Sequence, residues 1–157
     1  MEKENKKSIE FTKDQFSTLM KIVYLGNWIA NANRSGRPED PQIKEYEKME
    51  DYIFSLAAQF SLDKYVDHEP SDGERYFPTG LFEDETDVNK LHDEYDEENF
   101  WDELSERLGE RDFYNAYSKK DWQKMSRDER FLKLQECVIK WEEELENNGL
   151  ERINIKN

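Results

Sequence analysis

His92 and Asp96 are the pair of residues in this chain whose types and spacing come nearest to a metal site. They lie four apart on a predicted helix, so their side chains share one face and could bind a divalent metal together. A transition-metal centre needs further ligands, and nothing in the spacing brings Asp67, His68 or Glu69 to this pair. We therefore expect an ordinary helix histidine, no metal and no cofactor, with His92 and Asp96 as weak metal candidates.

The single cysteine, Cys137, lies on the apolar arc of the last predicted helix, between Leu134 and Trp141. Burial in the middle of a helix raises the pKa of a thiol, so we expect an inert side chain. One cysteine also excludes an intrachain disulfide. The sequence holds no Gly-rich phosphate loop, no Gly-x-Ser-x-Gly and no His-Glu-x-x-His motif. No catalytic residue is predicted, and the sequence favours a protein that is not an enzyme.

Asn27 and Asn31 lie four apart inside the most apolar stretch of the chain. Buried amides must be hydrogen-bonded. These two therefore either fix the register of a helix or line a polar pocket. A pocket near Asn27, Asn31 and His92 would suit a ligand-binding protein or an enzyme, which is our alternative interpretation.

The excess negative charge is concentrated in one segment. The chain has 38 acidic and 23 basic residues, and residues 81–112 hold 14 of the acidic and 3 of the basic ones. Such a run can be a solvated helix face, a docking surface for a basic protein, an imitation of nucleic-acid phosphates or a chelator of hard cations. Aromatic residues between the acids favour docking, because Tyr and Trp dominate interface energetics. The predicted contact residues are Tyr95, Glu97, Glu98, Phe100, Trp101 and Glu103.

Charge and hydropathy exclude other partners. A pI near 4.6 argues against binding nucleic acid or anionic membranes, which require basic surfaces. The longest uncharged run, residues 22–33, is too short to cross a bilayer. Residues 1–7 carry charges with no apolar stretch behind them, so we expect no secretory signal and a cytoplasmic location.

Capping signals place most of the helices that must position these side chains. Thr12 and Gln15 form a capping-box pattern before an apolar helix, and Asp40-Pro41 is typical of a second helix start, running to about residue 62. In that second helix the three-four spacing turns Tyr46, Met49 and Ile53 inward.

Helix-breaking Pro and Gly residues and helix-capping residues predict the remaining elements. Residues 63–82 contain Pro70, Gly73 and Pro78 and predict a long, partly ordered loop. Thr86 can cap a helix, and Asn99 with Asp102 could cap a following one, so this region is one bent helix or two. Short segments should start at Asp112 and Ser118. The last helix begins at Ser126, ends at Gly149 and has an apolar stripe of Phe131, Leu134, Val138, Trp141 and Leu145.

The composition gives opposing indications of whether the chain folds. A mean hydropathy of -1.15 leans towards disorder, whereas 13% aromatic residues favour folding. We predict an all-α, single bundle-like domain of five or six helices over residues 11–149, with tails at 1–10 and 150–157. The expected function is a small cytoplasmic, non-catalytic protein-interaction or regulatory module, monomeric or homodimeric. Its partner would have a basic surface, contacted by residues 81–112, and a nucleic-acid mimic is the third hypothesis.

Overall fold

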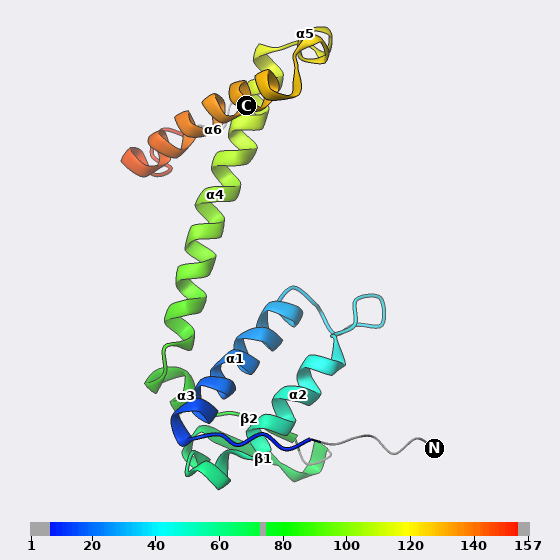
Figure 1. Cartoon of the computed structure of the whole chain (residues 1–157), viewed down its shortest axis with the longest axis vertical. Helices are drawn as coiled ribbons and strands as arrows, with labels where there is room; N and C mark the ends of the chain where they lie inside the picture. The colour runs from blue at the N-terminus through cyan, green and yellow to red at the C-terminus, as the bar shows by residue number, and fades with distance from the viewer. Residues whose placement is uncertain (1–6, 73–74, 154–157) are drawn as a thin grey trace. The chain divides into compact units, whose positions relative to one another are not determined.

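The computed structural model describes residues 7–72 and 75–153, which form six α-helices and one small antiparallel sheet (Figure 1). The predicted all-α class is confirmed. By its internal contacts the chain divides into two compact units, one ending at His92 and one beginning at Asp93. Each unit is described by itself.

Helix α1 (Lys13–Asn31) starts at the predicted capping box. The Thr12 hydroxyl accepts from the backbone N–H of Gln15 at 3.2 Å, and the Gln15 side chain accepts from the Thr12 N–H at 2.9 Å. Two orphan N–H groups of the first turn are thereby satisfied within four residues of sequence. This is why a purely local pattern located the helix start correctly.

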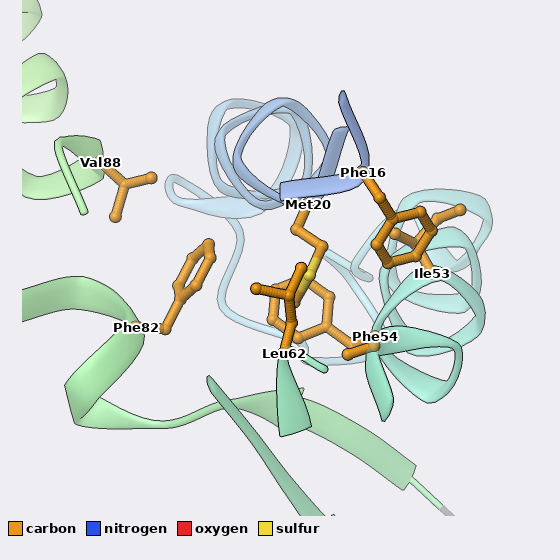
Figure 2. Packing of buried hydrophobic residues seen from close by; sticks show 8 residues of the cluster. Phe16, Met20, Ile53, Phe54, Leu62, Phe82 and Val88 are labelled. Atoms are coloured by element: carbon orange, nitrogen blue, oxygen red, sulfur yellow. The ribbon is translucent and has the colours of Figure 1, made fainter. Parts of the chain in front are cut away.

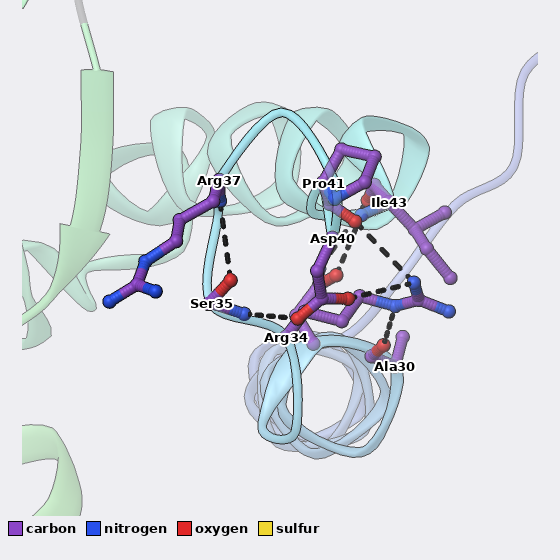
Figure 3. Close-up of polar contacts among 8 residues, drawn as sticks. Ala30, Arg34, Ser35, Arg37, Asp40, Pro41 and Ile43 are labelled. Carbon is purple, nitrogen blue, oxygen red and sulfur yellow. Dashed lines mark hydrogen bonds and ion pairs between the residues drawn. The ribbon is translucent and has the colours of Figure 1, made fainter.

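Helix α2 (Lys44–Ser55) begins later than Asp40-Pro41 predicts. The Asp40 carboxylate instead accepts from the backbone N–H of Ser35 at 2.8 Å, and Arg34 donates to the Pro41 carbonyl at 3.4 Å, so both bonds bridge the connection between α1 and α2 (Figure 3). Asp40 is therefore a turn residue, because its carboxylate satisfies the backbone behind it in the sequence.

The buried face of α2 is rotated from the predicted one. Tyr46 and Met49 are 48% and 53% exposed, so their assignment to the interior is wrong. Ile53 and Phe54 are buried, and Glu47 and Glu50 are half-buried. Residues 47, 50 and 54 lie three and four apart, so this face includes two glutamates. A hydropathy pattern assigns such residues to solvent.

The segment predicted as a long loop contains a β-hairpin. Strands β1 (Val66–Glu69) and β2 (Arg75–Pro78) pair antiparallel, with Val66 opposite Pro78 and His68 opposite Tyr76. Two short 3-10 turns, Ala57–Phe60 and Asp63–Tyr65, precede the hairpin, and a third, Pro70–Asp72, follows β1 within it. The loop prediction is wrong here because four-residue strands are too short to show an alternating pattern.

Helix α3 (Gly80–Glu85) follows the hairpin, and its N-cap Thr79 accepts from the N–H of Phe82 at 3.2 Å. The core of the first unit gathers side chains from α1, α2, the 3-10 turns, α3 and the start of α4 (Figure 2). Each fully buried apolar side chain of this kind contributes about 1.5–3 kcal/mol. The core residues are Phe16, Met20, Ile53, Phe54, Ala57, Leu62, Phe82 and Val88.

Helix α4 (Val88–Ala116) is one continuous element of 29 residues. Asn99 and Asp102 lie in its interior and start no new helix, and Asp112 also belongs to it. The buried Thr86 hydroxyl has no hydrogen-bond partner within residues 7–72 and 75–153, so its predicted capping role is wrong. Helix α5 (Lys119–Lys124) starts at the predicted Ser118, which forms a capping box with Asp121.

Helix α6 (Arg127–Asn148) begins at the predicted cap Ser126 and ends at Gly149, whose φ is +53°. In the second unit α4 passes close to α6 at Gly109. A Cβ atom added there would lie 2.6 Å from Val138 Cγ2 and 2.8 Å from Val138 Cα. Val138 and Leu145 are buried as predicted, whereas Phe131 is exposed. Glycine is required at this crossing because any side chain would separate the two backbones.

Candidate functional site

The residues predicted to form the contact surface, between positions 95 and 103, lie on α4. Every residue from 93 to 100 is exposed. Tyr95 is 52% and Phe100 47% exposed, so two large aromatic side chains stand among the carboxylates. Burial of such rings against a partner contributes more than the acids alone, because exposed ion pairs are worth about 0–1 kcal/mol each.

Two of the predicted contact carboxylates are held within the helix itself. The indole N–H of Trp101 donates to Glu97 at 2.6 Å, and the guanidinium of Arg107 pairs with Glu103 at 2.7 Å. The Phe100 ring packs edge-on against Trp101, with ring centroids 4.9 Å apart. Glu97 therefore orients the indole, in addition to carrying charge.

Trp101 also lines a hollow between α4 and α6, with a volume of about 640 Å³. Helix α4 contributes Trp101, Asp102 and the buried Ser105 to its wall. Helix α6 contributes Glu142, Leu145 and Glu146, and Gly149 completes the lining. Within the described part of the chain, this lining holds three carboxylates and neither Lys nor Arg.

Glu142 and Glu146 were missed by sequence reasoning. Residues 113–157 hold nine acidic and nine basic residues, so their average charge conceals the local run of acids at 142–146. The available signal was that run itself, Glu-Glu-Glu-Leu-Glu after Trp141. Only the crossing of α4 and α6 joins it to Trp101. The hollow that results combines three carboxylates with the indole of Trp101 and the side chain of Leu145.

The two asparagines of the predicted polar pocket have different roles. The buried Asn31 accepts from the backbone N–H of Ile43 at 2.7 Å and donates to Asn27 Oδ1 at 2.8 Å. It therefore satisfies the backbone N–H of Ile43, the N-cap residue of α2, which has no side-chain cap of its own. Asn27 lines a cavity of about 410 Å³ in the first unit, and its amide donates to Oε2 of Glu50 at 2.5 Å.

Glu50 is the chemically distinctive group of this cavity. Burial raises its pKa to about 7, with further raising by Asp51 and Glu47, against lowering by the Asn27 hydrogen bond and by Arg75. Nothing in the sequence pattern distinguishes Glu50 from the other glutamates of α2. His92 does not line the cavity; its ring packs against Trp28, with ring centroids 3.8 Å apart.

The remaining candidate residues are the candidate metal ligands and Cys137. In residues 7–72 and 75–153 no three His, Cys, Asp or Glu side chains are grouped so that they could hold a metal ion. Cys137 is half-buried and forms no disulfide.

These features define the molecule as a helical protein with a small hairpin, an acidic aromatic surface on one unit and a polar cavity in the other. Comparison with protein-family models, with curated proteins and with solved structures finds no match. Among the described helices, none is both long enough and apolar enough to span a membrane.

Proposed function

We propose that this protein is a non-catalytic interaction module whose second unit binds a protein with a basic surface. The observation that carries the proposal is the α4–α6 hollow, where Trp101 lies beside Asp102, Glu142 and Glu146. A cation in this hollow gains charge pairing and contact with the indole face together. The single cysteine suits a reducing compartment such as the cytoplasm.

In this proposal the hollow selects a basic side chain of the partner, and the exposed part of α4 attracts the partner before binding. One Lys or Arg of the partner enters beside Trp101, with its alkyl stem against Leu145. The exposed carboxylates at 93–98 attract the basic surface at long range and raise the association rate. Tyr95 and Phe100 then pack against the partner's apolar atoms and slow its dissociation.

The test compares two variants of equal charge by affinity capture from native lysate. The hollow variant carries Asp102→Asn, Glu142→Gln and Glu146→Gln. The control carries Glu106→Gln, Glu110→Gln and Glu136→Gln, which neutralise three exposed acids of the same unit outside the hollow. The proposal requires a basic protein that the wild type and the control retain and the hollow variant loses. Equal recovery on the hollow and control variants would contradict it.

A defined probe completes the test. A helical peptide rich in Arg and Lys should bind the wild type with an association rate that falls as salt increases, because screening removes the steering field. The hollow variant should bind this peptide at least about tenfold more weakly than the control variant. Identical affinities would show that the acids act only as diffuse charge.

A further inference from the structure

The cavity around Glu50 lies entirely within the first unit and is separate from the α4 surface proposed for partner binding. Helix α1 supplies Tyr24, Asn27 and Trp28, and α2 supplies Glu50. The hairpin supplies the remaining wall: Glu69, Arg75, Phe77 and Pro78. Its volume of about 410 Å³ falls at the lower end of the range for small-molecule sites, about 300–1,000 Å³.

Glu50 is held in position by a relay of side-chain amides. Ile43 N–H donates to Asn31, Asn31 donates to Asn27, and Asn27 donates to Glu50 Oε2. Because Asn27 Oδ1 accepts from Asn31, its NH₂ group is the end that faces Glu50. The carboxyl is therefore anchored on the wall by groups that belong to the α1–α2 packing, as a preorganised binding group requires.

The charges around Glu50 are unbalanced. On its own helix, Glu47 and Asp51 add negative potential, while Arg75 on β2 is the positive group that acts on it. Tyr24 and Asn27 face it from α1, and Glu69 lines the same cavity from β1. Burial outweighs the stabilising contacts, so the pKa of Glu50 is raised to about 7. Arg75 alone therefore does not offset the cost of burying the Glu50 carboxylate.

We propose that this cavity binds an alkylammonium group, whose charge pairs with Glu50 and Glu69 and whose carbon chain lies among Tyr24, Trp28 and Phe77. Two carboxyls against one guanidinium favour a cation over an anion. Three aromatic side chains in the lining add favourable electrostatics for a cation and apolar contact for its methylenes. The class includes free small amines and the side chain of a lysine.

The test is an NMR titration of the full ¹⁵N-labelled chain with n-butylammonium, 1-butanol and butyrate, probes of similar size that differ in charge. We expect n-butylammonium to shift the Asn27 side-chain NH₂ and the Trp28 indole N–H signals saturably, with a dissociation constant of about 1 mM for a ligand of about five heavy atoms. Neither 1-butanol nor butyrate should compete. No saturable shift up to about 50 mM amine, or tighter binding of butanol or butyrate, would overturn the proposal.

Matched variants connect binding to the cavity carboxyl. Glu50→Gln keeps the size of the side chain and can still accept from Asn27, and it should weaken n-butylammonium binding at least about tenfold at pH 8. Glu45→Gln removes one exposed charge from the same helix and should change affinity less than twofold. Far-UV circular dichroism checks that both variants fold. Equal affinity of these two variants would refute the assignment of Glu50.

Two further experiments test whether the alkylammonium group comes from a lysine side chain or a free amine, and whether binding requires deprotonated Glu50. Nα-acetyl-lysine methylamide binding at least as tightly as n-butylammonium would support a protein lysine as the natural ligand, and weaker binding would support a free amine. Affinity for n-butylammonium should increase from pH 6 to pH 8 as Glu50 loses its proton, and this increase should disappear in Glu50→Gln. A wild-type affinity that is flat with pH would contradict pairing with Glu50.

Discussion

The side-chain amide of Asn27 donates a 2.5 Å hydrogen bond to Oε2 of Glu50, which lies 23 residues further along the chain. This bond joins α1 to the half-buried acidic face of α2. It also links the cavity to the cap of α2, because Asn31 contacts both Asn27 and the Ile43 N–H. Local folding and the candidate ligand site therefore share one chain of amides.

Glu50→Gln should change how stability depends on pH. The raised pKa of Glu50 means that the folded state binds its proton more tightly than the unfolded state, whose value is near 4.5. The contribution of Glu50 to the free energy of unfolding is therefore full below about pH 4.5 and is lost as pH rises to about 7. After allowance for its partial exposure to solvent, the loss is about 1–2 kcal/mol.

The measurement is urea denaturation of the wild type and Glu50→Gln at pH 5 and pH 8. The variant should be close to the wild type at pH 5 and more stable by about 1–2 kcal/mol at pH 8. The difference between the two proteins isolates Glu50 from the other carboxylates. A constant difference between the two pH values would contradict the raised pKa.

Asn31→Ala should destabilise the first unit. The Ile43 N–H loses its acceptor and Asn27 loses its donor, both at partly buried positions. The expected loss is about 1–3 kcal/mol in the free energy of unfolding. Asn33→Ala is the control, because Asn33 is exposed two residues further on. Equal effects in chemical denaturation would show that the amide relay contributes nothing.

Gly109→Ala should lower the free energy of unfolding, whereas Gly26→Ala should raise it. At Gly109 the new Cβ would meet Val138 side-chain and backbone atoms at 2.6–2.8 Å, whereas at Gly26 nothing lies within 4 Å. We expect a loss of about 1–3 kcal/mol for Gly109→Ala and a gain of about 0.5–1 kcal/mol for Gly26→Ala.

Trimming Val138 should not rescue Gly109→Ala. Two of the three clashing atoms are the Val138 Cα and N, which any residue at that position retains. Thermal melts of both single variants and of Gly109→Ala/Val138→Ala test this. A Gly109→Ala protein as stable as the wild type would show that α4 and α6 can separate at this crossing without loss.

The acidic part of α4 should respond to salt in two directions. In the free protein, repulsion among exposed carboxylates weakens as the Debye length falls from about 30 Å at 0.01 M to about 8 Å at 0.15 M salt, so the melting temperature should rise. Association with the basic peptide should slow over the same range. Calorimetry and stopped-flow fluorescence measure the two trends, and an association rate insensitive to salt would argue against steering.

Charge reversal at single sites separates steering from structure. Glu98→Lys should slow association of the basic peptide with little change in stability, because Glu98 is fully on the exposed part of α4. Glu97→Lys and Glu103→Lys should also lower stability, by about 0.3–1 kcal/mol each, because they remove the contacts to Trp101 and Arg107. If all three variants bind the peptide like the wild type, the surface lies elsewhere.

Several elements were predictable from the sequence because their determinants are local. The starts of α1, α5 and α6 at Thr12, Ser118 and Ser126 follow from side chains that bond the backbone three residues ahead. The end of α6 at Gly149 follows from the positive φ that glycine adopts readily. The exposure of residues 93–100 agrees with their composition, because five of these eight residues are Asp or Glu.

Only the tertiary structure decided which acids form sites. Because α2 packs against α1, Glu50 faces the cavity of the first unit. The hydropathy pattern of α2 had instead placed Tyr46 and Met49 in the protein interior. The crossing at Gly109 brought Glu142 and Glu146 to Trp101 from about 40 residues away. Hydropathy and charge are properties of neighbours in sequence, whereas burial, pKa and cavity shape depend on contacts between elements, and for these two sites those contacts are not encoded in any local pattern.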